Sequence, residues 1–426
     1  MMRLSGIGAC ARALLVLTFV LLALPGSRAY AEQTCLACHK QQRDPRLRVP
    51  TVELPSSVHG HEGVQCSDCH GGRPDEPSLR AHDPEAHFRP RALAGQPQEV
   101  CGTCHSDKKR MAEADASVPT DQLELYENSV HGKALARGNA RAATCATCHG
   151  SHDVKKVNDP LSRVNRANVA ATCGHCHSDA ELMDSVKMPH DQERAWRHSV
   201  HGQRYALWLQ SHPTGVAPPG ERHPPTCIDC HKDHGIGPRD SATAGCQGCH
   251  KAEWDSFSSG PHQKAFKRMG FLPCVDCHGS HEITPVDATL IGVGNEAACR
   301  RCHAEGQRMF DDIKALGLAV RAAETAATDA RASLASAPVR LLAVKLQPVD
   351  EAQTALRTTI HTLDIKKIKA AAAELTARAV KATVPPEPAS TKLEQARVWT
   401  PVIIFALGLA VLLFGVFGRR GGGDEP

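Results

Sequence analysis

Two uninterrupted apolar runs lie near the ends of a chain whose other segments mix apolar and polar residues. The first run, Ala13–Leu24, follows Arg3 and Arg12 and precedes the small residues around Ala29-Tyr30-Ala31. Basic residues, a short apolar stretch and small residues in this order predict a secretory signal peptide over residues 1–31. An uncleaved N-terminal anchor is the alternative interpretation.

The second run, Trp399–Gly418, is long enough to cross a membrane as a helix. Its 20 residues rise about 30 Å at about 1.5 Å per residue, which matches a hydrocarbon layer of about 30 Å. Trp399 suits the membrane interface, and Arg419-Arg420 suit the cytoplasmic side. The sequence therefore predicts one C-terminal transmembrane helix over 397–420 and a cytoplasmic tail over 421–426. The rest of the mature chain is expected on the periplasmic side of the inner membrane.

The segment between these runs changes character once, near residue 305. Residues 32–305 are rich in Pro, Gly and charge and show no long helical periodicity, so we expect short helices and loops there. Residues 306–337 and 349–383 carry apolar residues at helical spacing and predict a long α-helical hairpin or stalk, which Pro338 and Pro348 are expected to interrupt. A Pro-rich linker extends this segment to residue 396. The predicted fold class is therefore mostly α and irregular.

Cysteine and histidine content adds chemistry to this outline. The chain has 19 Cys and 25 His, and 18 of the cysteines form nine C-x-x-C pairs that are each followed by His. The paired cysteines are Cys35 and Cys38, Cys66 and Cys69, Cys101 and Cys104, Cys145 and Cys148, Cys173 and Cys176, Cys227 and Cys230, Cys246 and Cys249, Cys274 and Cys277, and Cys299 and Cys302. The histidines that follow them are His39, His70, His105, His149, His177, His231, His250, His278 and His303.

This motif attaches c-type haem, because two thiols bind the haem edge and the adjacent His ligates its iron. A zinc site, a redox dithiol or a disulfide framework can also use C-x-x-C, but none of them requires His after every one of nine copies. The 274 residues from 32 to 305 leave about 30 per motif, too few for a peptide core without a cofactor. We therefore expect nine covalent haem c groups. A net charge of +4 without a basic stripe indicates no nucleic-acid partner.

The motifs alternate between two types of surroundings. Type A motifs begin at Cys35, Cys101, Cys173, Cys246 and Cys299, and type B motifs begin at Cys66, Cys145, Cys227 and Cys274. Another His recurs between each A motif and the following B motif, three times within S-V-H-G, and a further one follows each B motif. The first series is His59, His131, His201 and His262, and the second is His82, His152, His234 and His281. Recurrence in register makes these eight the expected sixth ligands of the irons.

Nine irons require a ninth sixth ligand. The shortfall is expected at the terminal motif, Cys299–His303, because no B motif follows it. We predict that His190, which has no counterpart in the preceding unit, fills this place; an open iron is the alternative. Met as a sixth ligand raises the haem potential, but no Met recurs in register, so mostly bis-His ligation and low potentials are expected.

Residues 35–303 resemble the periplasmic multihaem cytochromes of the doubled-CxxCH class, and are similar to the decahaem conduit cytochromes of anaerobic respiration. The C-x-x-C-H-x-x-H motifs and the S-V-H-G histidines carry the resemblance. It implies bis-His haems packed in chains. It also implies electron transfer between a membrane quinol-oxidising complex, or another inner-membrane redox subunit, and periplasmic cytochromes or extracellular acceptors.

Electron transfer is therefore the expected function, in an anaerobic or extracellular respiratory chain. The alternative is a multihaem reductase of nitrite, hydroxylamine or a sulfur oxyanion, which needs one iron with an open face. No C-x-x-C is followed by Lys, the variant typical of pentahaem nitrite reductases. A third hypothesis assigns a structural or sensory role to 306–383, for which a plain spacer is the simpler interpretation.

Overall fold

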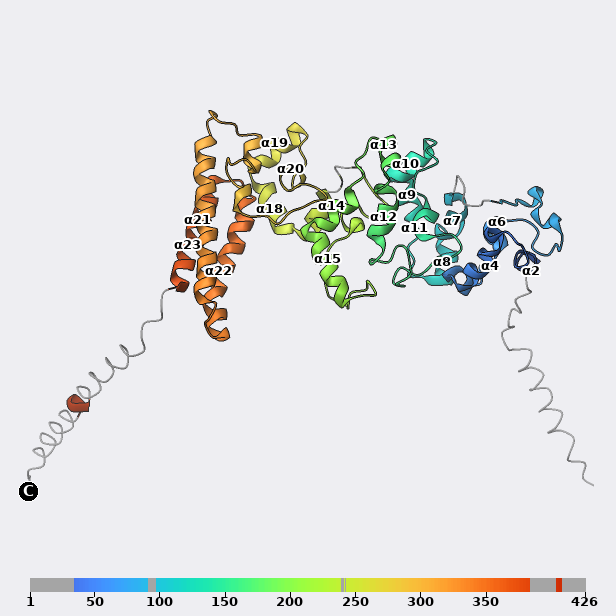
Figure 1. Ribbon diagram of the computed structural model, residues 1–426, viewed down its shortest axis with the longest axis horizontal. Helices are drawn as coiled ribbons and strands as arrows, with labels where there is room; N and C mark the ends of the chain where they lie inside the picture. The colour runs from blue at the N-terminus through green and yellow to red at the C-terminus, as the bar shows by residue number, and fades with distance from the viewer. Residues whose placement is uncertain (1–33, 91–96, 239–240, 242, 384–403, 408–426) are drawn as a thin grey trace, which may run out of the picture. The chain divides into compact units, whose positions relative to one another are not determined.

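A computed structural model describes residues 34–90, 97–238, 241, 243–383 and 404–407 (Figure 1). These residues form helices and loops and include no strand, which confirms the mostly α class. The chain divides into two compact units. Unit 1 lies within 1–249 and 272–285, and unit 2 within 250–271 and 286–426. The last C-x-x-C-H motif therefore belongs with the long helices, whereas the sequence predicted a boundary at residue 305.

Unit 1 consists of short helices separated by loops. Its α-helices are α2 Thr34–His39, α3 Pro45–Arg48, α4 Pro50–Glu53, α5 Val58–His61, α6 Cys66–His70, α7 Pro97–His105, α8 Lys108–Asp115, α9 Gln122–Asn128, α10 Val130–Ala136, α11 Cys145–His149, α12 Val169–His177, α13 Ala180–Ser185, α14 Gln192–His198, α15 Val200–Ser211, α16 Cys227–His231, α17 Thr243–Cys249 and α20 Val275–His278. The 3-10 turns are η1 Leu54–Ser56, η2 Leu79–His82 and η3 Pro84–Ala86. Few large apolar side chains are buried in this unit, Tyr205 and Trp208 among them.

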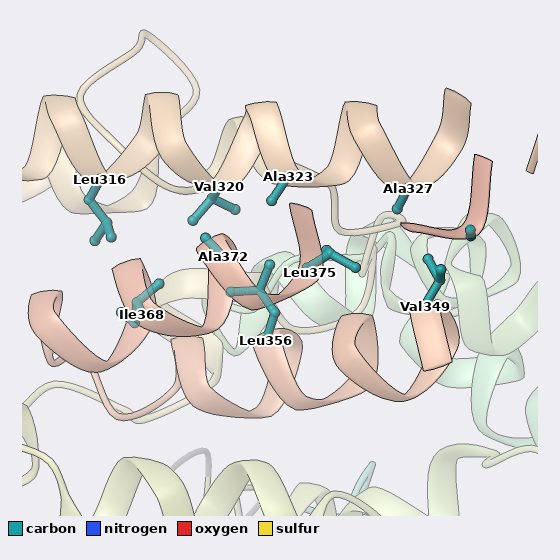
Figure 2. Packing of buried hydrophobic residues seen from close by; sticks show 10 residues of the cluster. Leu316, Val320, Ala323, Ala327, Val349, Leu356, Ile368, Ala372 and Leu375 are labelled. Atoms are coloured by element: carbon teal, nitrogen blue, oxygen red, sulfur yellow. The ribbon is translucent and has the colours of Figure 1, made fainter. Parts of the chain in front are cut away.

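Unit 2 is built around a bundle of three long helices. They are α21 Phe310–Leu334, α22 Val339–Ile360 and α23 Ile365–Thr383, joined in this unit by α18 Lys251–Ser259, α19 His262–Met269, η5 Ala288–Leu290 and η6 Ala298–Arg301. Figure 2 shows the core between the three helices. On α21 and α23 its residues recur at alternating steps of four and three, the spacing of helices that pack side by side. The core residues are Leu316, Val320, Ala323 and Ala327 of α21, Val349 and Leu356 of α22, and Ile368, Ala372, Leu375 and Ala382 of α23.

The predicted hairpin is thus a three-helix bundle. Pro348, expected to interrupt the helical segment, lies inside α22. The break falls instead after Ile360, where Leu363 has a positive φ of 52° and α23 begins two residues later. Alanine-rich faces let the helices approach closely. Gln353 sits at one core position and is satisfied by α21, because Arg331 donates to it at 2.6 Å and it donates to Glu324.

The two terminal segments predicted from the apolar runs lie almost entirely outside the described residues. Of Trp399–Gly418, only Ile404–Leu407 is described, as helix. Among the described residues, no helix is both long and apolar enough to cross a membrane. The predicted signal peptide at 1–31 is outside the described range.

Candidate haem sites

Seven of the motif histidines lie beside a second imidazole. In each pair the two ring centroids are 5.9–6.2 Å apart. Each pair joins one C-x-x-C-H histidine to one of the recurring histidines. The pairs are His39 with His82, His105 with His59, His70 with His152, His177 with His131, His149 with His234, His231 with His281, and His303 with His262.

This separation fits a bis-His iron. A metal–imidazole bond of about 2 Å, as in zinc sites, places a ring centroid about 3 Å from the metal, so two rings on opposite sides are about 6 Å apart. Two rings in van der Waals stacking lie closer, and unrelated surface rings have no reason to share one spacing seven times. The porphyrin supplies four of the six ligands, so two imidazoles complete the shell.

The pairs follow a fixed register along the chain. His59 and His131, from the S-V-H-G series, each lie beside the histidine of the next A motif. Each histidine that follows a later B motif lies instead beside the histidine of the preceding B motif, as His152 does with His70. Each of these pairs therefore combines a histidine of one repeat unit with a histidine of the next unit.

The register corrects the expected place of the missing ligand. His303 of the terminal A motif lies 6.1 Å from His262, so the terminal motif has its histidine partner. No B motif follows Cys274–His278. The sixth ligand for His278 therefore has to come from outside the series that supplies the earlier B motifs.

The two outer residues of the S-V-H-G sequence, the serine and the glycine, each have a structural role. Ser57, Ser129 and Ser199 cap the helices that carry His59, His131 and His201, each accepting a hydrogen bond from the glycine N–H at 3.0–3.1 Å. A Cβ on any of these glycines would collide with the backbone of the preceding helix or turn; on Gly132 it would lie 2.9 Å from the Glu127 Cα. The cap and the close approach together fix the direction of the histidine between them.

A hydrogen bond that the sequence analysis missed ties the two histidine series together. The valine N–H of S-V-H-G donates to a carbonyl two residues after the histidine that follows a B motif. The three bonds are Val58 to Val154, Val130 to Ile236, and Val200 to Ile283, all 2.9 Å. The sequence did contain a signal for this bond, because the residue two positions after the histidine is β-branched in all three cases. Each bond therefore fixes the position of one S-V-H-G histidine relative to one histidine that follows a B motif. Both histidines are predicted sixth ligands.

Three of the B motifs are single helical turns that begin with a capping box. In α6, α11 and α16, the residue before the first Cys and the residue before the second Cys cap each other; these pairs are Gln65 with Asp68, Thr144 with Thr147, and Thr226 with Asp229. Arg166 also holds the Asp229 carboxylate at 2.6 Å. The residue after the motif His has a positive φ, as at Gly150 with 84°. Glycine is favoured there, and the chain can turn away from the histidine.

Burial lowers the pKa of nine of the paired imidazoles and so favours the neutral form, which is the form that binds a metal. Desolvation lowers the pKa of His59, and the neighbouring His105 lowers it further. The pKa of His149 falls to about 4, chiefly through burial and then through His234 and other nearby histidines. The Nδ1 atom of His70 lies 2.8 Å from the Arg89 carbonyl, which leaves Nε2 for a metal.

Among the described residues, the motif cysteines form no disulfide. In unit 1, thiols of consecutive motifs are close enough to form hydrogen bonds or to shift each other's pKa. Burial and then Cys173 raise the pKa of Cys148 to about 11, for example, and a hydrogen bond from Cys101 lowers the pKa of Cys145 to about 7. The neighbouring thiols are Cys35 and Cys66, Cys69 and Cys104, Cys101 and Cys145, Cys148 and Cys173, Cys173 and Cys227, Cys230 and Cys246, and Cys246 and Cys274.

Two expected sixth ligands remain, His201 and His190. His201 lies in the first turn of α15, in the position that His131 has in α10. His190 is half-exposed, and its Nδ1 atom lies 3.6 Å from the Asp184 carboxylate. Its assignment as the ninth ligand stays a prediction.

Comparisons with known proteins give no relative. No protein-family model matches the chain, and no curated protein or solved structure is significantly similar to it. Among the described residues, no group of three or more His, Cys, Asp or Glu side chains is arranged to hold a metal ion. A bis-His haem site contributes only two such ligands from the protein.

Proposed function

We propose that this chain is a multihaem electron-transfer cytochrome that binds nine haem c groups covalently. The observation that carries the proposal is the set of seven imidazole pairs with ring centroids 5.9–6.2 Å apart. Each pair contains the histidine of an attachment motif and therefore lies where a covalently bound haem would present its iron.

The protein residues do two things at such sites. The cysteines would hold the edge of the group, and the two imidazoles of a pair would ligate its iron, which would exclude small substrates from the metal. Haem bound in this way supplies reversible one-electron chemistry at low potential. Full axial coordination favours electron transfer over a reductase, whose substrate needs an open axial position.

Continuity along unit 1 supports a conducting array. Thiols of the first eight motifs form an unbroken series of neighbours, beginning with Cys35 and Cys66 and ending with Cys246 and Cys274. Groups attached to consecutive motifs therefore start from neighbouring points of the chain. An electron carrier needs this succession, whereas a single catalytic centre does not.

The location belongs to the same proposal. The signal peptide at 1–31 and the apolar run Trp399–Gly418 favour export and anchoring by one helix, with the haem-binding part on the periplasmic side. Such a protein would receive electrons from a quinol-oxidising complex or another inner-membrane redox subunit. It would pass them to periplasmic cytochromes.

Replacement of one predicted sixth ligand tests the proposal. A His152→Ala variant keeps all attachment cysteines, so its intact mass should still show nine haems. One of nine irons, that of the His70 site, should become high-spin in the electron paramagnetic resonance spectrum and bind carbon monoxide when reduced. His198→Ala, at an exposed position next to S-V-H-G, is the matched control and should leave both readouts unchanged. A mass that corresponds to seven or fewer haems, or an unaltered spectrum of the His152 variant, rejects the proposal.

A further inference from the structure

One end of the three-helix bundle combines exposed apolar side chains with an excess of positive charge. It is formed by the end of α21, the start of α22 and the end of α23, residues 334–346 and 379–383, and is called the apolar end here. Arg331 of α21 pairs with Asp350 of α22 at 2.6 Å, and Lys345 of α22 donates to the Ala382 carbonyl of α23 at 3.2 Å. These two contacts place the three helix ends together.

Large apolar side chains at this end face solvent. Val339 is 80% exposed, Val344 72%, and Val380 57%. Val339 also lines a shallow groove along α22 together with Leu342, Ala343 and Leu346. Val344 and Val380 point away from the bundle core that Val349 and Leu375 occupy, so helix packing does not account for them. An apolar patch on an outer surface marks a place of interaction.

The charge of the apolar end has one sign. Residues 334–346 and 379–383 contain no Asp or Glu but include Arg340, Lys345 and Lys381. Arg331 and Arg378 lie just outside this end and pair with Asp350 and Glu374. The opposite end of α21 begins with Asp311 and Asp312. Apolar residues interspersed with cations are the composition by which peripheral protein surfaces bind anionic lipid.

The chain also leaves the bundle at this end. Helix α23 ends at Thr383, and the sequence reaches the apolar run at Trp399 after only 15 residues. Fully extended, 15 residues span at most about 50 Å. The proposed transmembrane helix would therefore keep the apolar end close to the bilayer, and the short linker makes a second contact there favourable.

We propose that the apolar end of the bundle rests on the anionic phospholipid surface of the membrane, with Val339, Val344 and Val380 in the interface and Arg340 at the headgroups. This inference rests on the proposed C-terminal anchor. It goes further, because it makes the bundle a membrane-contacting element with a fixed orientation rather than a spacer.

Photo-crosslinking of the full-length haem-loaded protein in nanodiscs tests the contact. The discs contain a photoactivatable phospholipid in either phosphatidylglycerol or phosphatidylcholine, and crosslinked residues are located by mass spectrometry. Crosslinks are expected at 399–418 and also at 339–346 and 380, the latter stronger with phosphatidylglycerol. Arg340→Gln should lower the crosslink yield at 339–346 about fivefold at low salt, the effect of one cation near an anionic surface.

Two variants separate this contact from the anchor. Val344→Asp should abolish crosslinks at 339–346 and 380 while those at 399–418 persist; Leu318→Asp, at a 56% exposed position on α21, is the control and should change neither. Crosslinks at 399–418 alone overturn the surface contact and leave the anchor standing. Crosslinks at the apolar end alone support the contact and reject the anchor. No crosslinks at either place reject both, and equal yields in the two lipids overturn the anionic preference.

Discussion

The close approach at Gly132 predicts that one methyl group can open one haem site. Gly132 follows His131 in the first turn of α10, and His131 pairs with His177 at 6.2 Å. A Cβ at position 132 would lie 2.9 Å from the Glu127 Cα and closer still to the Tyr126 carbonyl oxygen. Contacts of a Cβ below 3.0 Å essentially do not occur, and both neighbours are backbone atoms, so one helix has to move.

The size of the movement decides the outcome. Relief of the contact with the Tyr126 carbonyl requires a shift of roughly 1 Å in the first turn of α10. A metal–ligand bond tolerates about 0.2 Å. Gly132→Ala should therefore detach His131 from the iron while the cysteines and His177 remain in place. The overpacking itself should cost about 1–3 kcal/mol in unfolding free energy.

Two spectroscopic measurements and one thermal measurement follow this change. The oxidised variant should show a high-spin ferric signal worth one haem in nine, and the reduced variant should bind one equivalent of carbon monoxide. Thermal unfolding should begin at a lower temperature. Gly294→Ala is the matched control, because a Cβ at Gly294 meets nothing within 4 Å. It should leave all three measurements unchanged.

A Gly132→Ala variant with an all-low-spin spectrum and unchanged thermal stability would refute this reasoning. It would mean either that the helix approach is looser than described or that His131 is not a ligand. Carbon monoxide binding at another iron would not rescue it, because the prediction concerns only the site of His177.

Three further predictions concern the core, the cofactor and the ninth ligand. Leu375→Ala, fully buried in the bundle, should cost about 2–5 kcal/mol in denaturant unfolding, whereas Leu318→Ala at the surface should stay within about 0.5 kcal/mol; equal losses would contradict the described core. Protein made without haem attachment should lose unit 1 to limited proteolysis but keep a protected fragment over 310–383, because in the described part of the chain only the bundle has an extensive apolar core of its own; equal digestion of both would count against this. His190→Ala should remove one low-spin species in nine from the oxidised spectrum, and an identical spectrum excludes His190 as a ligand.

Much of the candidate site could be predicted because the chemistry is local. The spacing of Cys35 and Cys38 and the adjacent His39 are set within one helical turn, so the sequence alone identifies the attachment motif. Recurrence added the second histidine series. His59 and His152, singled out only because they repeat, are among the residues that the structure brings beside motif histidines.

The register could not be predicted, because it depends on contacts far apart in the chain. His152 stands three residues from His149, yet its ring lies beside His70 rather than beside its neighbour's. The bond from Val58 to the Val154 carbonyl, which crosses 96 residues, helps to set that choice. The recurring β-branched residue hints at a shared role but does not say which residue the bond reaches, and for this reason the missing ligand was expected at His303.

The sequence predicted a hairpin where the structure has three long helices, and this error has a different cause. Proline usually ends a helix, because it lacks an N–H and its ring crowds the preceding turn. Pro348 nevertheless lies inside α22, next to Val349, which is fully buried between the helices. Tertiary packing of this kind overrides local propensity, and no single-sequence pattern reveals when it will.

The interleaving of ligands between repeat units sets an order in time. His152 follows His70 by 82 residues, which ribosomes add in about 4–16 s at about 5–20 residues per second. During that interval, an iron attached at the first B motif would have only one of its protein ligands. The same holds for the second and third B motifs until His234 and His281 follow. A chain truncated directly after any of the first three B motifs would retain this immature state permanently at its last B site, so such shortened arrays should end in a reactive iron.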